Sequence, residues 1–242
     1  MNIQGRSALI TGASRGLGRA LAEALAKQGA RLALVARHAG PLQDTAASIR
    51  AQGGVAHTIV ADLGDKDAVH RIAGQAQGHI GDIDLVIHNA STLGPTPLRL
   101  LLDTECEDLA AVLETNLVGP FRLTKVLAGA MALRGAGVVV HISSDAAVEA
   151  YPRWGAYSIS KAAQDHLSRV LAAELEGTGV RVLSVDPGEM DTVMHAEAIP
   201  DADRTQLARP AAIAARIVQM IADPARAAHG ARLVAPRWEL AS

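Results

Sequence analysis

The 242-residue sequence contains few aromatic residues and a single cysteine. Aromatic residues make up 2% of the chain while apolar residues make up 49%, so the core must be built from Ala, Leu, Val and Ile. The one cysteine, Cys106, excludes an internal disulfide and suits a reducing compartment. Because free cysteines are usually buried and inert, we expect this thiol to be buried or half-buried and to take no part in chemistry.

A strong charge of one sign and long apolar runs are also absent. The formal net charge of −2, a pI near 6.5 and the scattered basic residues give no electrostatic basis for binding nucleic acid. No apolar stretch approaches the ~18 residues that would span a bilayer, and no basic leader precedes the first apolar segment. We therefore expect a cytoplasmic protein with neither a nucleic-acid nor a membrane partner.

The nine histidines are not spaced as metal ligands are, so we predict that the protein has no metal site. His88, His141 and His166 are expected to be structural residues. His195 lies in a long loop and could touch a substrate, but we expect its side chain to face solvent.

Short apolar runs alternate along the chain with longer segments of helical period. Near-continuous apolar runs are typical of parallel strands that are buried on both faces. The predicted strands are Ser7–Ile10, Arg31–Ala36, Val55–Val60, Ile83–His88, Val138–Ile142, Val180–Val185 and Ala231–Val234. The predicted helices are Gly18–Gln28, Pro41–Gln52, Lys66–Gln77, Leu109–Leu133, Ala156–Glu176 and Pro210–Ile221. This order indicates a single α/β domain over residues 1–242, a Rossmann-like doubly wound sheet of about seven parallel strands with helices on both faces.

Two loops stand out by composition or length. Residues 91–97 are rich in turn residues and follow the predicted fourth strand, whereas residues 187–209 follow the predicted sixth strand and have weak helical periodicity. Both loops leave the carboxyl ends of strands, which is where open α/β sheets bind their ligands. We therefore expect residues 187–209 to form a substrate loop.

The first predicted strand runs into a glycine-rich turn, Thr11-Gly12-Ala13-Ser14-Arg15-Gly16-Leu17-Gly18, and then into a helix. Glycines in such a turn permit a tight bend and a close approach of the backbone to a pyrophosphate. The helix N-terminus adds free N–H groups and a favourable dipole. The position of this turn between the first strand and the first helix predicts a nucleotide site.

Tyr157 and Lys161 are four residues apart on a predicted helix and therefore share one face of it. A phenol has an ordinary pKa of ~10, too high for efficient proton exchange near neutral pH. Because a neighbouring cation favours the phenolate, we expect Lys161 to lower the pKa of Tyr157 toward the working range. Taken alone, the two residues could also be an ordinary exposed pair.

The glycine turn, with its spacing Thr-Gly-x-x-x-Gly-x-Gly, resembles that of the short-chain dehydrogenase/reductase family. Further motifs of that family follow in order over essentially the whole chain, at Asp62, Asn89-Ala90, Asn116, Ser144, Tyr157, Lys161 and Pro187-Gly188. The resemblance implies an oxidoreductase that moves a hydride between NADP(H) and a ketone, an aldehyde or a secondary alcohol. It also implies that Tyr157 is the general acid/base of the reaction.

The resemblance assigns roles to the surrounding residues. It implies that Ser144 holds the substrate oxygen, that Lys161 binds the cofactor ribose, and that Asn116 kinks its helix and holds a water beside the lysine. Ser143 is expected to be structural, and the segment Pro187–Thr192 is expected to orient the nicotinamide. The predicted cofactor contacts are Gly12, Ser14, Arg15, Gly16, Leu17, Gly18, Arg37, Asp62, Leu63, Asn89, Ala90, Tyr157, Lys161, Pro187, Gly188, Met190 and Thr192.

The end of the second predicted strand indicates which cofactor is bound. NAD-selective sites usually place an acid there to accept from the ribose 2′-OH, but this strand ends at Arg37. Arg37 can instead bind a 2′-phosphate through paired charge-assisted hydrogen bonds, and Arg15 is placed to reach the same group. We therefore predict NADP(H). Asp62, expected at the adenine, could also cap the helix that begins near Asp65.

Two features depart from the family pattern. Ser91 stands where the family has the glycine of its Asn-Asn-Ala-Gly motif, and residues 231–242 lack the usual glycine-rich ending. The second departure weakens the inference of the family's common tetramer. We expect a homodimer or homotetramer that associates through residues 109–133 and 156–176.

Two other functions are compatible with this fold. Short-chain epimerases and dehydratases share it, although most have longer substrate domains than this chain offers. A non-catalytic NADP(H)-binding regulatory protein is the alternative outside enzymes. Such a regulator would be expected to have lost Tyr157 or Lys161, and both are present.

Overall fold

A computed structural model of the protein describes residues 1–240. Its strands form one parallel sheet in the order β3-β2-β1-β4-β5-β6-β7. The strands are β1 Ser7–Thr11, β2 Arg31–Ala36, β3 Val55–Val60, β4 Leu85–His88, β5 Gly137–Ile142, β6 Val180–Asp186 and β7 Arg232–Val234. Because β1 pairs with β2 on one side and β4 on the other, the winding reverses at β1. The predicted doubly wound fold is confirmed.

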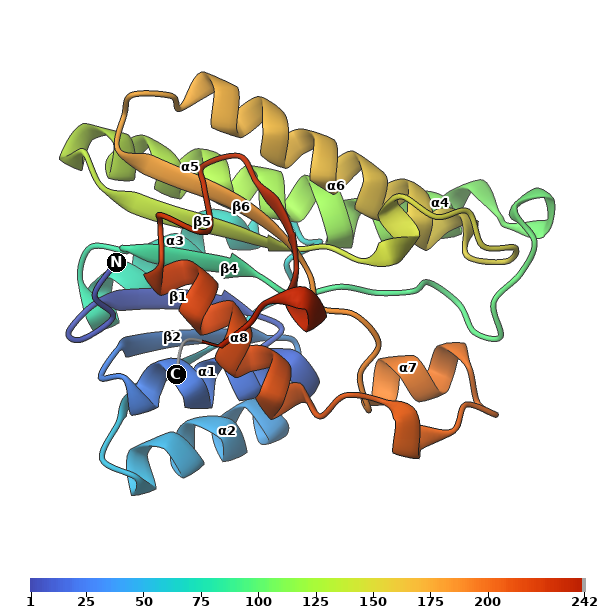
Figure 1. Cartoon of the computed structure of the whole chain (residues 1–242), viewed down its shortest axis with the longest axis horizontal. Helices are drawn as coiled ribbons and strands as arrows, with labels where there is room; N and C mark the ends of the chain where they lie inside the picture. The colour runs from blue at the N-terminus through green and yellow to red at the C-terminus, as the bar shows by residue number, and fades with distance from the viewer. Residues whose placement is uncertain (241–242) are drawn as a thin grey trace.

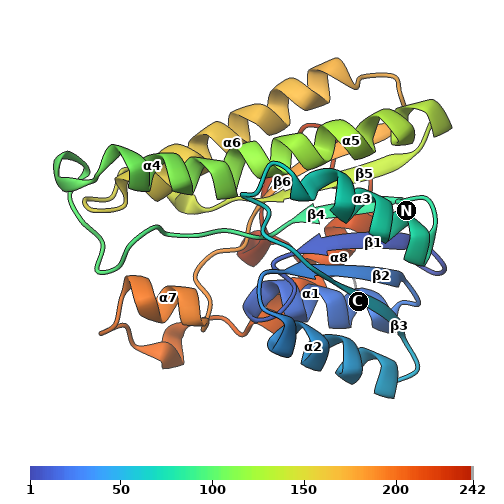
Figure 2. The ribbon, with the colours of Figure 1, turned by 180° about the vertical axis from the view of Figure 1, so that it is seen from behind.

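Helices cover both faces of the sheet (Figures 1 and 2). One face carries α1 (Gly16–Lys27), α2 (Ala39–Ala51) and α8 (Pro210–Ala222), whose apolar side chains join one buried cluster with the strands. The other face carries α3 (Ala68–Ile80), α5 (Gly119–Arg134) and α6 (Gly155–Glu174), which join a second cluster. Strands enclosed in this way need apolar residues on both faces, as the near-continuous runs predicted.

The single helix predicted over Leu109–Leu133 is interrupted in the structure. α4 (Cys106–Leu113) passes into a π-helical segment, Glu114–Val118, before α5 begins. Pro120 has no backbone N–H and therefore cannot donate to the carbonyl of Asn116, four residues earlier, as an α-helix would require. The helical periodicity correctly predicted that this whole segment is helical. It did not predict the π-helical turn within it.

The predicted substrate loop is more ordered than its weak periodicity indicated. It contains the short helix α7 (Val193–Ala198) and a 3-10 turn, Arg204–Gln206. The side chain of Thr192 caps α7, since its Oγ1 accepts from the backbone N of His195 at 3.2 Å. Met190 and Ala208 pair as an isolated bridge, which joins the beginning of this loop to its end.

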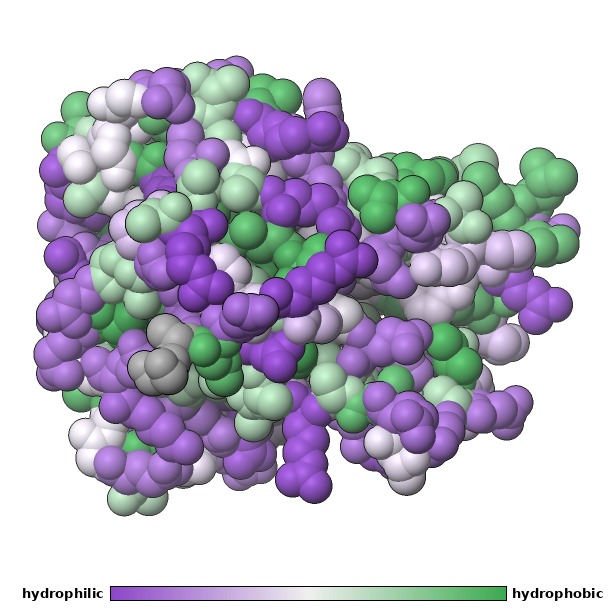
Figure 3. All heavy atoms as spheres, viewed as in Figure 1, coloured by the Kyte–Doolittle hydropathy of each residue, from purple (hydrophilic) through white to green (hydrophobic). Residues whose placement is uncertain are grey.

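The expectation that Cys106 is buried or half-buried is wrong, because this cysteine is exposed at the first residue of α4. The same end of the molecule carries apolar side chains at its surface, seen in Figure 3 over the region of α4 in Figure 1. They include Leu102, which is 98% exposed in the loop before α4. Among residues 1–240, no helix is long and apolar enough to cross a membrane.

Candidate active site

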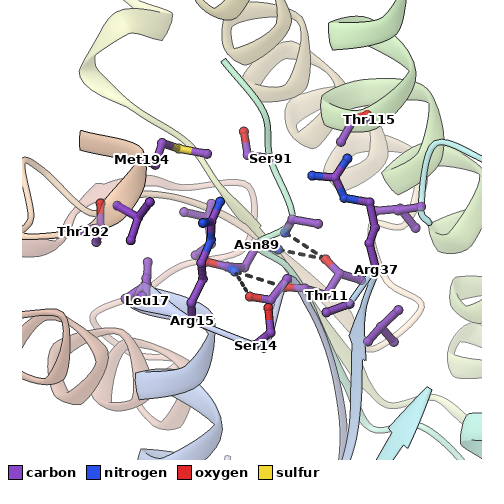
Figure 4. Close-up of a pocket in the computed structure, with 18 of the residues that line it drawn as sticks. Thr11, Ser14, Arg15, Leu17, Arg37, Asn89, Ser91, Thr115, Thr192 and Met194 are labelled. Atoms are coloured by element: carbon purple, nitrogen blue, oxygen red, sulfur yellow. Dashed lines mark hydrogen bonds between the residues drawn. The ribbon is translucent and has the colours of Figure 1, made fainter. Parts of the chain in front are cut away.

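A cavity of about 330 Å³ lies at the carboxyl ends of the central strands (Figure 4). Most of the predicted cofactor contacts line it together. They are Gly12, Ser14, Arg15, Gly16, Leu17, Arg37, Asp62, Leu63, Asn89, Ala90, Tyr157, Lys161, Pro187, Met190 and Thr192. The structure thus gathers residues from both sides of the point where the winding reverses, the place where such sheets bind nucleotides.

The glycine turn packs closely against the segment that follows β4. Gly12 has φ +67°, and a Cβ at this position would lie 2.8 Å from Cα of Ala90. The side chain of Asn89 holds the turn, because its Nδ2 donates to the carbonyls of Thr11 and Gly12, each at 3.1 Å. Gly18 does not line the cavity; a Cβ there would collide with the carbonyl oxygen of Gly12. Gly18 therefore acts by letting α1 pack against the turn.

Two exposed arginines flank this cavity. Figure 4 shows Arg15 on the glycine turn and Arg37 at the end of β2, with Asn89 between them. Neither guanidinium has a hydrogen bond or ion pair among the interactions resolved within residues 1–240. No carboxylate stands at the end of β2, since Ala36 is followed by Arg37 and His38. The donor set at this point fits a phosphate.

Asp62 and Leu63 lie where β3 meets the cavity. The carboxylate of Asp62 accepts from the backbone N of Gly64 at 2.9 Å and does not cap α3, which begins later, with Asp67 as its N-cap residue. The alternative role weighed for Asp62 is therefore wrong.

A second cavity of about 250 Å³ adjoins the first. It is enclosed by the segment after β5, the start of α6 and the substrate loop, and it holds Ser144 and Gly188 among its lining residues. Tyr157 lines both cavities. A ligand in the first cavity and a ligand in the second would therefore meet at this phenol.

Ser144 lies two residues after the end of β5 and is the N-cap residue of the 3-10 turn Asp145–Ala147. Its Oγ donates to Oδ1 of Asp145 at 2.9 Å and accepts from the backbone N of Ala146 at 3.2 Å. The neighbouring Ser143 is buried and its Oγ donates to the carbonyl of Ser144 at 3.4 Å. The hydroxyl of Ser144 is thus oriented by its own turn.

The pKa of Tyr157 corrects an expectation from the sequence. Burial raises it to about 12, while the hydroxyls of Ser144 and Ser91 act in the opposite direction. Lys161 does not offset the burial, because its Nζ lies 5.6 Å from the centroid of the tyrosine ring and donates elsewhere, to the carbonyl of Ile142 at 2.7 Å. The phenol therefore keeps its proton at neutral pH.

Lys161 is 2% exposed, and burial lowers the pKa of its ammonium to about 8, with Asp165 acting to raise it.

Asn116 is fully buried behind the cavity wall. Its side chain is held by the backbone of Thr92 on both sides, with Oδ1 accepting at 2.8 Å and Nδ2 donating at 2.9 Å, and Nδ2 also donates to Ser160 at 2.9 Å. Of the four predicted catalytic residues, Tyr157 thus lines both cavities, Lys161 the first and Ser144 the second, whereas Asn116 lines neither.

The depressed pKa of Lys161 predicts a pH-dependent stability. Between about pH 8 and 10.5, the ordinary pKa of a lysine, the unfolded chain keeps a proton on this residue that the folded chain has released, so its contribution to the free energy of unfolding rises with pH. We expect the difference in unfolding free energy between Lys161→Met and the wild type to shift in favour of the wild type by about 3 kcal/mol over this window. Denaturant titrations at several pH values measure it, and a constant difference would contradict the prediction.

Comparisons with known proteins decide the family. A family model described as short chain dehydrogenase matches residues 6–203. The chain belongs to the short-chain dehydrogenase family. It is 37% identical over 199 residues to the "Short chain dehydrogenase MYCFIDRAFT_6125" of Pseudocercospora fijiensis, an alignment that spans 80% of this chain and 62% of that protein.

Solved structures of short-chain dehydrogenases superpose closely on this one. A short chain dehydrogenase from Shigella flexneri 2a, complexed with NADP, has a TM-score of 0.90 at 29% identity and covers 97% of this chain and 98% of its own. An NAD⁺-bound xylitol dehydrogenase has a TM-score of 0.86 at 25% identity, covering 97% of each chain. The family therefore binds nicotinamide cofactors, and both forms occur among its members.

Sequence reasoning missed an ionic cluster beneath the site of this short-chain dehydrogenase. Arg232 on β7 pairs with Asp165 of α6 at 2.8 Å and with Asp186, the last residue of β6, at 3.3 Å. Its guanidinium also donates to the carbonyl of Ser144 at 2.9 Å, and Asp186 accepts from the backbone N of Gly188 at 2.9 Å. One guanidinium thus ties the serine segment to the Pro187-Gly188 turn. A charged residue in the otherwise apolar last predicted strand was the available signal.

Replacing Arg232 with Met is expected to destabilise the fold by about 3 kcal/mol, because the buried carboxylates of Asp165 and Asp186 both lose the guanidinium that pairs with them. Chemical denaturation followed by circular dichroism measures this loss. Arg6→Met, which breaks an exposed pair with Asp84, is the matched control and should cost less than about 1 kcal/mol. Equal losses in the two variants would contradict the assignment.

The histidines divide into two groups. His88 and His141 stack with ring centroids 4.9 Å apart in the buried sheet, and burial lowers the pKa of each, that of His141 to about 4. They are neutral and interior, as expected for structural histidines, whereas His166 is exposed and bonds Arg169 at 3.2 Å. The expectation for His195 is wrong: its side chain is only 12% exposed and lines the second cavity. No group of potential metal ligands occurs within residues 1–240.

Proposed function

We propose that this short-chain dehydrogenase transfers a hydride between NADP(H) and a ketone, an aldehyde or a secondary alcohol. One observation carries the proposal: Tyr157 lines both the cavity beside the glycine turn and the second cavity, which is large enough for a small molecule. Ser144, whose hydroxyl can hold a substrate oxygen, lines the second cavity as well. The comparisons support the reaction class through the family, and the structure supplies the arrangement of groups.

The proposed roles follow from where each group lies. The bound cofactor supplies the hydride that reduces the carbonyl carbon. Tyr157 gives its proton to the carbonyl oxygen as the alcohol forms, and Ser144 holds that oxygen with a hydrogen bond. Lys161 would contact the cofactor ribose, and its ammonium, 5.6 Å from the centroid of the tyrosine ring, would favour the phenolate as the phenol loses its proton. A phenol that stays protonated at neutral pH suits the reductive direction.

NADP(H) is proposed over NAD(H) because of Arg15 and Arg37. Both guanidiniums flank the cavity beside the end of β2, where they can bind a 2′-phosphate, and no acid is present there to accept from a 2′-hydroxyl. The Shigella flexneri structure complexed with NADP supports this choice, whereas the NAD⁺-bound xylitol dehydrogenase shows that the fold accommodates either cofactor.

The purified protein tests the proposal directly. We expect consumption of NADPH, followed by its absorbance, with at least one member of a panel of ketones and aldehydes, and slower consumption of NADH. Tight NADPH binding without turnover of any carbonyl or alcohol would favour the regulatory alternative. Redox-neutral conversion of a sugar nucleotide or a β-hydroxy compound would favour an epimerase or dehydratase.

The charge around the second cavity predicts which substrates are preferred. Among its described lining residues, Asp145 and Glu189 carry carboxylates, and none is Lys or Arg. We expect a keto acid to have a kcat/KM about tenfold below that of its neutral ester, since like charges repel in a cleft. Glu189→Gln should narrow this ratio and Glu174→Gln, at the far end of α6, should leave it unchanged. Preference for the acid would contradict the prediction.

We also propose that the protein is a homodimer or homotetramer that associates through the faces of α5 and α6. Apolar side chains are exposed on these helices, including Phe121 on α5 and Ile159 and Val170 on α6, each at least 40% exposed. Light scattering across a range of protein concentrations measures the oligomeric state.

A further inference from the structure

The backbone carbonyl of Asn116 has no partner within its own α-helical pattern. The residue four positions later is Pro120, which has no N–H to donate, and the surrounding turn is π-helical. A buried carbonyl without a partner is costly, so a donor from another element stabilises this oxygen. The donor is Nε2 of Gln164, on α6, at 2.8 Å.

The other end of the same amide holds Lys161. Gln164 lies one helical turn after the lysine on α6 and is fully buried. Its Oε1 accepts from Nζ of Lys161 at 3.2 Å, while Nζ also donates to the carbonyl of Ile142 at 2.7 Å. An ammonium can only donate and a carbonyl can only accept, so the two partners leave one orientation for the amide. Gln164 therefore links the ammonium of Lys161 to the carbonyl of Asn116 without a break.

We propose that Gln164 is a positioning residue for Lys161. Its side chain links Asn116 to the lysine, a link that the family resemblance assigns to a water. The inference rests on the proposed function for its catalytic meaning, but the link itself is independent of turnover. A water can take one proton and release another, whereas the amide holds both neighbours by hydrogen bonds without exchanging protons along them. Lys161 is thus fixed in place between Gln164 and the carbonyl of Ile142.

The groups that face Lys161 determine how a substitution at Gln164 would change the pKa of the lysine. Asp165 on α6 acts to raise the pKa of the lysine, and the charge of Lys161 in turn lowers the pKa of His141 on β5. The ring of Tyr157 lies beneath its ammonium. Removing the acceptor at Gln164 leaves these neighbours in place and takes away one favourable interaction with the charged form.

Two substitutions at Gln164 should move the titration of Lys161 in opposite directions. Gln164→Leu removes the acceptor and should lower the pKa of Lys161 by about one unit, whereas Gln164→Glu adds a carboxylate and should raise it by a similar amount. Carbon-13 NMR of labelled lysine, with the Lys161 signal assigned by its loss in Lys161→Met, measures both without any substrate. The alkaline limb of the pH profile of kcat should move to lower pH in Gln164→Leu and to higher pH in Gln164→Glu. We expect kcat of Gln164→Leu to fall about tenfold and KM for NADPH to change less.

Ser168→Ala is the matched control, because it deletes the buried hydrogen bonds of Ser168 Oγ with the carbonyl of Gln164 and with Nδ1 of His141 without removing a hydrogen-bond partner of Lys161. It should leave the lysine titration unchanged. Opposite shifts in the two Gln164 variants support the proposal. An unchanged pKa of Lys161 in both variants, or pKa shifts of the same sign, would overturn it. If Gln164→Leu does not fold, the pKa of Lys161 in Gln164→Glu alone tests the proposal. Normal shifts in a protein without carbonyl turnover would reject the proposed function alone.

Discussion

Tyr157→Phe is expected to lower kcat for carbonyl reduction by about 10³-fold, because the ring remains while the proton donor is lost. The substitution removes one oxygen from a buried side chain whose ring packs against Trp154, with centroids 5.8 Å apart, so the fold should be retained. Stopped-flow and steady-state measurements of NADPH consumption give kcat, and fluorescence titration gives the affinity for NADPH, which should change less than about threefold.

Tyr151→Phe is the matched control for this variant. Tyr151 is the other tyrosine of the chain, lines the second cavity and donates to Asp145 at 3.0 Å, but does not line the first cavity. Its loss should alter KM for the substrate and leave kcat within about tenfold. Comparable losses of kcat in the two variants, or full activity in Tyr157→Phe, would mean that the proton comes from another group.

Arg37→Asp is expected to lower kcat/KM for NADPH by at least about 10²-fold while that for NADH rises or stays the same. The change removes a charge-assisted pair to the proposed 2′-phosphate and sets a carboxylate against it. The new carboxylate can also accept from the 2′-hydroxyl of NADH at the end of β2, the position that NAD-selective sheets use. Initial rates with both cofactors, at one ionic strength, measure the change in preference.

The control for Arg37→Asp is the same charge reversal at Lys27, the last residue of α1, which is exposed and does not line the cavity. It should leave the ratio between NADPH and NADH unchanged. Arg15→Asp should lower that ratio in the same direction as Arg37→Asp. A ratio that moves in neither arginine variant would show that the two guanidiniums do not bind the cofactor.

The residues that sequence reasoning predicted share one property: their proposed roles were inferred from neighbours close in the chain. The glycine turn lies within one strand–turn–helix unit, and Tyr157 and Lys161 are one helical turn apart. The order of apolar runs predicted the sheet because buried parallel strands require apolar residues on both faces. Even the placement of Arg37 follows from the rule that ligands bind at the carboxyl ends of strands.

The features that the sequence could not predict arise between segments far apart in the chain. Gln164 meets the carbonyl of Asn116 across 48 residues, and Arg232 meets that of Ser144 across 88. The pKa of Tyr157 depends on how many atoms bury it, so a lysine one turn away did not determine its direction. The sequence alone thus predicted the family and the sheet, which are confirmed, and it supplied the hypothesis of which groups react. Only the tertiary structure decided what holds those groups and whether the phenol keeps its proton, because burial and long-range hydrogen bonds exist only once the chain has folded.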